Sequence, residues 1–294
     1  MCNRKKLIEM TNLRLFHRLI ESGMKMLYGD NPDKVVKLRI DWEKKHIIDA
    51  GFVDYYIMAF WIFRFFGSAN ETEIWARGAM SSSVVCYCLA LTEVDPMKYD
   101  LHSVRFVNDE IPFFQFDIEG QRFDEFMKQA EELLEANAKS FDIPKIRKCL
   151  LRDLKPMEYL NKKKETPLPE NLNDEIARYA LYYPQTMDLY EKYVQNPQCD
   201  ILIYQEQMLS ILKYSFHVNS IKANQIRLSI QRGDTEQVAE YKKELFSNLK
   251  DITLDEAEIS WQRLISNPNA FLKAHAVSRV LARYKYDFKI PSDK

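Results

Sequence analysis

The sequence predicts a mostly α-helical α+β protein that contains one small β-sheet. Only 7 of the 294 residues are glycine, whereas 16 are tyrosine and 17 are phenylalanine. This composition disfavours folds built on many tight turns and favours long helices with aromatic packing. Apolar residues recur at helical spacing over most of the chain, and only two short segments are rich in β-forming residues. The length allows one large or two small domains.

The N-terminal part is predicted to be a series of helices. Apolar residues follow a helical period over 12–28, and a second amphipathic helix is expected after Asp33. The longest apolar run, 51–66, contains Asp54 and Arg64 and is shorter than the roughly 20 residues that a membrane-spanning helix needs. We therefore expect a buried helix in this run and no membrane association.

Strand signals gather in the middle of the chain. Segments 103–107 and 112–118 are short and aromatic, so we expect a small sheet there. Helical spacing precedes them over 81–91 and returns over 121–138. The stretch 161–173 is the most loop-like, and the chain beyond it is predicted to be helical. Helix starts are expected near Asn219, Asp234, Thr253 and Asn267.

Composition also excludes several classes of protein and site. The five cysteines are odd in number and scattered, which argues against a disulfide framework. No pair of histidines or cysteines has the spacing of a zinc site. The N-terminus lacks the features of a secretory signal, so we expect a cytoplasmic protein. Because the net charge is −1, any surface that binds nucleic acid must be local.

Four separated segments carry recognisable motifs. They are WARGAMSSSVVCYCLALTEVDPMKYDL (75–101), RFVN (105–108), CLLRDLKP with ALYYP (149–184), and ILIYQEQM, ANQIRLSI and NAFLKAHAVSRVLARY (201–284). In this order they resemble the polymerase core of the bacterial replicative DNA polymerase III alpha subunit. The resemblance covers most of residues 10–285 and implies a polymerase-like fold.

The resemblance implies a shortened polymerase palm over 1–138 and a helical fingers-like region over 139–294. The expected fold is therefore a predominantly helical α+β remnant of a palm, with a small sheet, followed by helices. The family's N-terminal phosphoesterase domain and its C-terminal clamp-binding and OB-fold regions have no room in this length. The gap between Phe126 and Lys145 is also too short for the thumb and the second half of the palm. We therefore expect a truncated protein.

The metal-binding motif of the family is degraded here. Phosphoryl transfer by two Mg²⁺ ions needs palm carboxylates, which a strand supplies at positions i and i+2. An alignment on Pro112 puts Phe113 and Gln115 at the two metal-binding positions and leaves Asp117 at a third, non-catalytic acid. A rival register makes Asp117 and Glu119 the catalytic, metal-binding pair, with Mg²⁺ as the cofactor. The first register is favoured because Arg122 and Asp124 fall out of step in the rival one. The rival pair would also lack the family's third aspartate, which lies in the missing palm segment.

The positions that the resemblance assigns to nucleotide phosphates are partly retained. They are Arg77, Gly78, Ser82 and Ser83 in the glycine-rich loop and Arg227, Lys273 and His275 in the fingers-like region. Backbone amides and hydroxyls at such a loop can bind an anion. The serines can equally well only cap a helix, and the basic residues can belong to an ordinary solvated helix.

We therefore predict a DNA polymerase III alpha-like protein that has lost nucleotidyl transfer. It is expected to bind nucleotide or DNA, or to associate with replication proteins. The alternative is a residual metal-dependent polymerase that uses Asp117 and Glu119. A third reading is a relic without selected activity, in which oligomerisation covers apolar patches. The first reading is favoured because several losses fall on charged active-site positions while the hydrophobic framework is kept.

Overall fold

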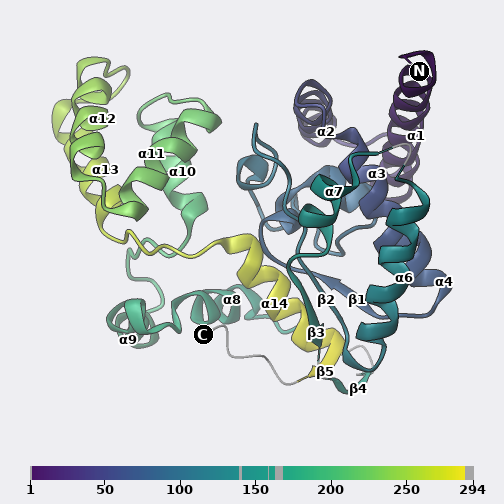
Figure 1. The fold of residues 1–294 in the computed structure, drawn as a ribbon. Coiled ribbons are helices and arrows are strands. Elements are labelled where there is room, and N and C mark those ends of the chain that lie inside the picture. Colours follow the sequence, from purple (N-terminus) through teal and green to yellow (C-terminus); the bar gives the residue numbers. More distant parts are fainter. Residues whose placement is uncertain (1, 139–140, 158, 163–167, 289–294) are drawn as a thin grey trace. The chain divides into compact units, whose positions relative to one another are not determined.

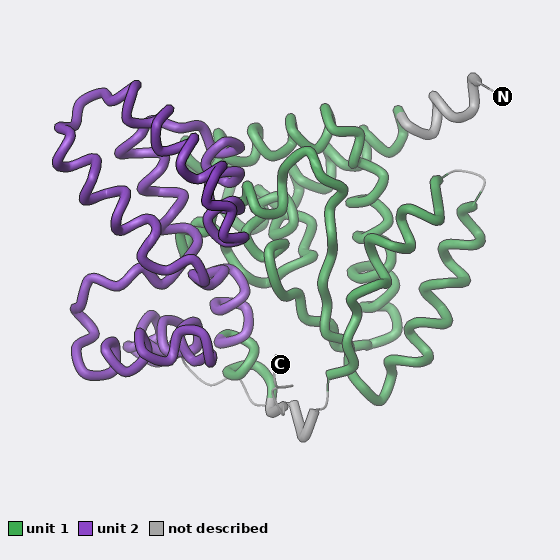
Figure 2. Tube along the Cα trace, turned by 60° about the vertical axis from the view of Figure 1, so that its left-hand side comes forward, with its two compact units in different colours: residues 1–167, 281–294 green, residues 168–280 purple. Residues whose placement is uncertain are grey.

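The computed structural model describes residues 2–138, 141–157, 159–162 and 168–288. The chain divides into two compact units (Figure 2). Unit 1 consists of residues 1–167 and 281–294, and unit 2 of residues 168–280. We describe each unit by itself. The boundary predicted at residue 138, between a palm-like and a fingers-like region, is a separate assignment and stays a prediction.

Unit 1 is mainly helical. Its α-helices are α1 (Cys2–Tyr28), α2 (Lys34–Asp49), α3 (Val53–Ala59), α4 (Gly67–Ala69), α5 (Val84–Cys88), α6 (Phe123–Ala136) and α7 (Ile143–Leu150), shown in Figure 1. A π-helical segment spans Phe60–Phe66, and 3₁₀ turns span Gly78–Ser82, Ser103–Arg105 and Gly120–Arg122. The last helix of the chain, α14 (Lys273–Lys285), starts in unit 2 and ends in unit 1.

A three-stranded sheet lies in unit 1. Strand β2 (Phe116–Glu119) is central, with β1 (Ile74–Ala76) antiparallel on one side and β3 (Leu154–Met157) parallel on the other. A second, two-stranded sheet pairs β4 (Tyr159–Lys162) with β5 (Tyr286–Phe288). Helices together with this small mixed sheet confirm the predicted α+β class.

Most predicted helices of unit 1 are confirmed, and α2 shows why. The Asp33 side chain accepts a hydrogen bond from the backbone N–H of Val35 at 2.7 Å and caps the helix. The aromatic run continues from α3 into the π-helical segment without forming one regular helix. Among the described residues, no single helix passes the length and composition test for a membrane span. The pair 34–49 and 53–69, bent by 109°, passes it jointly.

The prediction of a strand over 103–107 is wrong. The segment starts with a 3₁₀ turn, and the backbone N–H groups of Phe106 and Val107 both donate to the Ser103 carbonyl at 2.7 Å. Val104, Phe106 and Val107 are buried. β-forming side chains therefore fill the core here without pairing in a sheet, because β-propensity largely reflects burial. The predicted strand over 112–118 is confirmed in part, as β2 over 116–119.

One face of β2 packs into the core of unit 1. The Phe116 ring stacks on Phe63 with their centroids 3.9 Å apart, and Phe63 stacks on Phe126 of α6 at 5.9 Å. Ile118 is also fully buried. Because successive strand residues point to opposite faces, Asp117 is directed to the other face of the sheet. That face carries the candidate site.

Unit 2 contains α8 (Leu172–Leu181), α9 (Met187–Gln195), α10 (Gln205–Tyr214), α11 (Ser220–Arg232), α12 (Thr235–Ser247), α13 (Leu254–Ile265) and the start of α14. The predicted starts at Asn219, Asp234 and Thr253 are confirmed, since each side chain accepts from a backbone N–H of its helix. The start predicted near Asn267 is wrong. The backbone of Phe271 instead bonds to Ile203 and Gln205, and α14 begins only at Lys273. The loop predicted over 161–173 falls partly outside the described residues.

The close approach of α1 and α5 generates a test of the packing. A Cβ added at Gly23 would lie 1.9 Å from the carbonyl oxygen of Cys88. Gly23→Ala should therefore force the helices apart and lower the free energy of unfolding by about 1–3 kcal/mol or more. The exposed neighbouring change Ser22→Ala should alter it by less than about 0.5 kcal/mol. Equal urea midpoints for the two variants would contradict this packing.

Candidate functional site

The side chain of Arg77 joins two carboxylates on the polar face of the sheet. Its Nε donates to Asp117 Oδ1 at 3.0 Å, and its Nη2 donates to Asp153 Oδ1 at 2.8 Å. The same Nη2 donates to the backbone carbonyl of Asp153 at 2.8 Å. Arg77 is 3% exposed and Asp117 is 2% exposed. These contacts form an ion triad in which Arg77 and Asp117 are buried and Asp153 is partly exposed.

The strands explain why these groups meet. Arg77 follows β1 directly, and its backbone N–H donates to the Gln115 carbonyl at 3.0 Å. Asp153 precedes β3, which pairs in parallel with β2. The Gln115 side-chain amide donates to the second oxygen of Asp153. We call Arg77, Gln115, Asp117 and Asp153 the Arg77 cluster.

Hydrogen bonding favours the ionised form of Asp153. Burial alone would raise the pKa of Asp153, but hydrogen bonds from Arg77 and Gln115 and the charges of Arg77 and Lys155 hold that pKa below its ordinary value. Lys155 stands opposite Asp117 in the register of β2 and β3. The two carboxylates of the cluster are thus balanced by a guanidinium within it and an ammonium beside it.

The residues of the cluster do not fit a magnesium site. Mg²⁺ requires oxygen ligands in near-octahedral geometry. Phe113 has no ligand atom, and Gln115 directs an N–H donor at Asp153. The Arg77 guanidinium already lies between the two carboxylates. Among the residues that the structure describes, no group of three His, Cys, Asp or Glu side chains could hold a metal ion.

Glu119 has different surroundings from Asp117. Its carboxylate accepts from the backbone N–H of Glu73 at 3.3 Å and lies 3.9 Å from Nε of Arg122. Asp117 is instead bonded to Arg77. The two acids that the rival register pairs therefore share a strand but not a set of partners.

The retained glycine of the predicted phosphate loop has a packing role. Gly78 has φ +72°, and a Cβ at this position would lie 2.0 Å from Oε1 of Gln115. Glycine is therefore required both by the left-handed backbone and by the close approach of the cluster. A phosphate-binding role is therefore not needed to explain the glycine at this position.

The two predicted serines are fully buried and bonded within the protein. The Ser82 hydroxyl donates to the Ala79 carbonyl at 2.7 Å, and the Ser83 hydroxyl donates to the Glu43 carboxylate at 2.7 Å. Ser83 also caps α5. Glu43 additionally accepts from the backbone N–H groups of Val84 and Val85. A buried carboxylate thus occupies the helix start at which an anion was expected.

Glu43 is a residue that the sequence patterns did not single out. It is fully buried and forms an ion pair with Arg39 at 2.7 Å. Arg39 also donates to the carbonyls of Ser82 and Leu101. Glu43 lies on α2 at a position that continues the helical spacing of the buried residues Val36, Ile40 and Ile47. That spacing, an acid on the apolar side of a helix, is the only signal that could have found it.

The predicted residues of unit 2 have local partners of their own. The Glu206 carboxylate accepts hydrogen bonds from the backbone N–H groups of Lys273 and Ala274, at 3.0 and 3.4 Å, at the start of α14. The Lys273 ammonium lies 5.7 Å from the centroid of the Tyr204 ring, and the His275 ring lies 5.7 Å from that of Phe271. Arg227 is fully buried and donates to Asn224 and Gln231.

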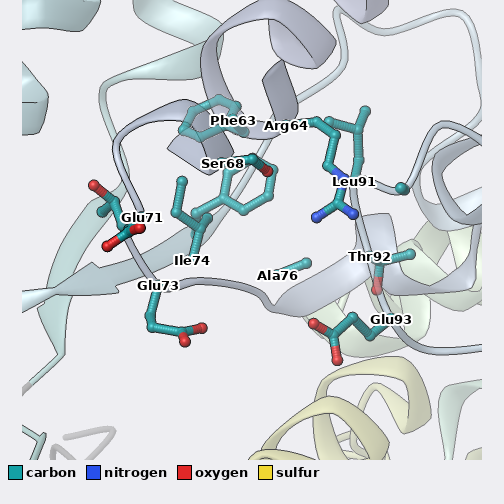
Figure 3. Close-up of a pocket in the computed structure, with 13 residues that line it drawn as sticks. Phe63, Arg64, Ser68, Glu71, Glu73, Ile74, Ala76, Leu91, Thr92 and Glu93 are labelled. Atoms are coloured by element: carbon teal, nitrogen blue, oxygen red, sulfur yellow. The ribbon is translucent and has the colours of Figure 1, made fainter. Parts of the chain in front are cut away.

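A separate cavity of about 480 Å³ lies in unit 1 (Figure 3). Phe116 and Ala76 contribute to its lining, so strand alternation places it on the sheet face opposite Asp117. Its charged lining residues are Arg64, Glu71, Glu73 and Glu93. Lys285 pairs with Glu93, but the carboxylates of Glu71 and Glu73 still outnumber the Arg64 guanidinium, which makes this cavity unfavourable for a phosphate.

The ion triad should dominate the stability of unit 1. Asp117→Asn removes the carboxylate that is buried with Arg77 and leaves the guanidinium only the partly exposed Asp153, so the free energy of unfolding should fall by about 1.5–3 kcal/mol. Asp49→Asn breaks an exposed ion pair with Lys45 and should cost less than about 1 kcal/mol. Urea denaturation of the full chain measures both. A loss for Asp117→Asn no larger than for Asp49→Asn would refute the triad.

Glu206 should make stability depend on pH in a defined direction. Burial raises the pKa of its carboxyl. Its contribution to stability is therefore complete below the unfolded pKa of about 4.3 and is lost as the pH rises through the folded pKa. Glu206→Gln does not titrate, so the wild type should lose stability relative to this variant as the pH rises above about 4.3.

Urea unfolding at several pH values measures this difference in free energy. A wild type that gains stability over Glu206→Gln with rising pH would contradict the assignment.

Comparisons with known proteins agree with the motifs of the N-terminal half. Residues 14–148 match the family model of the bacterial DNA polymerase III alpha NTPase domain. The chain is 32% identical over 123 residues to DNA polymerase III subunit alpha of Halalkalibacterium halodurans, covering 41% of this chain and 11% of the relative. It is 36% identical over 118 residues to the same subunit of Borreliella burgdorferi, covering 39% and 10%.

The chain is also 33% identical over 121 residues to the error-prone DNA polymerase of Cutibacterium acnes, covering 40% of this chain and 10% of that protein. The matched stretch thus spans about a tenth of the length of these relatives. The fingers-like resemblance beyond residue 148 lies outside the family match and stays a prediction. Over residues 14–148, which include Arg77, Gln115 and Asp117, the chain is DNA polymerase III alpha-like.

Proposed function

We propose that this DNA polymerase III alpha-like chain binds nucleotide or single-stranded nucleic acid without catalysing nucleotidyl transfer. The observation that carries the proposal is the buried guanidinium of Arg77 between Asp117 and Asp153. In the relatives' fold, the corresponding palm carboxylates are expected to face Mg²⁺. Here a fixed cation of the protein neutralises the carboxylates that are present.

Competition with Arg77 argues against catalysis. A metal ion that used Asp117 would have to displace a guanidinium that is 3% exposed and hydrogen-bonded to three acceptor atoms. Removing one partner of a buried ion pair costs about 3–5 kcal/mol. Phe113 and Gln115, at the two aligned metal positions, supply no carboxylate to offset that cost.

Two cations beside the cluster support binding of a phosphate-bearing ligand. Arg152 is exposed, and Lys155, half-buried, stands opposite Asp117 in the sheet. The carboxylates of the cluster are already engaged by Arg77. Because the charge of Lys155 already acts on Asp153, we expect exposed Arg152 to make the main contact with phosphate oxygens, which supply most of the affinity in sequence-independent nucleic-acid binding.

The alternative function is a residual polymerase that uses Asp117 and Glu119 with Mg²⁺. It requires Arg77 to leave Asp117 and Glu119 to leave the Glu73 amide. The remaining proposals are association with replication proteins and a cytoplasmic location. Both rest on the names of the relatives, which are replicative and error-prone DNA polymerases.

Two assays on the same protein test the proposal. Fluorescence anisotropy with a labelled oligonucleotide should show binding whose affinity falls as the salt concentration rises. At equal salt, Arg152→Gln should bind the oligonucleotide more weakly than the wild type. Primer extension with all four deoxynucleotides and Mg²⁺ or Mn²⁺ should give no product. Extension that disappears in Asp117→Ala but persists in the exposed control Asp109→Ala would establish the residual polymerase instead.

A further inference from the structure

Phe113 is an exposed aromatic residue beside the Arg77 cluster. Its side chain is 37% exposed, whereas Phe114 and Phe116 are 0% and 1% exposed. Phe114 and Phe116 alternate into the core, so Phe113 is on the same side of the chain as Gln115 and Asp117. Ile111, two residues earlier, is 48% exposed. The polar face of the sheet therefore continues into a small apolar surface open to solvent.

The Phe113 ring has a cation close to it. The guanidinium carbon of Arg152 lies 5.9 Å from the centroid of Phe113, within the range of a cation–π contact. Arg152 is itself exposed and immediately precedes Asp153 of the cluster. The ring and the cation thus come from two segments that the ion triad holds together.

We propose that Phe113 is a stacking platform for one nucleobase, with Arg152 contacting the adjoining phosphate. This inference rests on the proposed function and specifies how its ligand is held. Every base has a π-face, so stacking on an exposed aromatic ring is independent of sequence. A guanidinium next to the ring can engage phosphate oxygens of the same nucleotide.

The chemistry of the patch favours a nucleotide over a purely apolar partner. Of the exposed large apolar side chains that the structure describes, Ile111 and Phe113 lie in this segment, and the cations Arg152 and Lys155 lie in the segment beside it. A docking surface for an apolar protein face or a lipid would need a larger contiguous patch. One planar base joined to one phosphate has the size and charge that this surface accommodates.

The test measures binding of a fluorescein-labelled oligothymidylate to the full chain by anisotropy. Phe113→Ala should weaken binding about tenfold, and Phe113→Trp should restore it, because base stacking contributes about 1–3 kcal/mol per base. Phe65→Ala is the matched control, since Phe65 is 59% exposed elsewhere in unit 1. It should leave affinity unchanged. Urea midpoints verify that each variant is folded.

An abasic strand of equal length separates base from phosphate. The wild type and Phe113→Ala should bind it equally, whereas Arg152→Gln should weaken binding of both strands. Competition by thymidine monophosphate tests whether one nucleotide suffices. If the wild type binds oligothymidylate and Phe113→Ala binds it equally well, the stacking site is wrong while the proposed function stands. If the wild type binds neither strand nor the mononucleotide, the proposed function itself fails.

Discussion

A buried guanidinium held between two carboxylates is the interaction on which the site in unit 1 depends. Arg77 directly follows the strand β1, Asp117 lies in the central strand β2, and Asp153 directly precedes the strand β3. Each charge is stable in the interior only because the others are present. The same triad fixes Gln115, which explains the glycine at position 78, and it sets the position of Arg152 beside Phe113.

Carboxylates of the protein also occupy helix starts elsewhere. Glu43 accepts from backbone amides at the start of α5, and Glu206 does so at the start of α14. A helix N-terminus attracts anions because its amides lack partners. Once an internal carboxylate supplies those partners, the helix start offers little to a phosphate. The phosphate-bearing ligand that we propose would therefore have to be bound by side chains such as Arg152, Lys155 or Lys273.

The sequence predicted the helices from their spacing and caps, and it predicted the mixed class. It failed where tertiary packing decided the outcome. The β-forming side chains of 103–107 pack in the core without pairing in a sheet. Because the backbone of Phe271 is hydrogen-bonded to Ile203 and Gln205, α14 begins later in the chain than predicted. At the site, the motif singled out Arg77 and Asp117 but gave no sign that they bind each other. Nor did it reveal Asp153 or Glu43, because a buried acid and a solvated acid look alike in sequence.

We propose that Arg77 occupies the place that a metal ion would need, so that Asp117 does not bind a metal ion. Electron paramagnetic resonance of Mn²⁺ titrated into the full chain measures this directly, with Asp117→Ala as the comparison. We expect identical binding curves for the two proteins, because Asp117 is engaged by the guanidinium. Stoichiometric Mn²⁺ binding by the wild type that is lost in Asp117→Ala would contradict it.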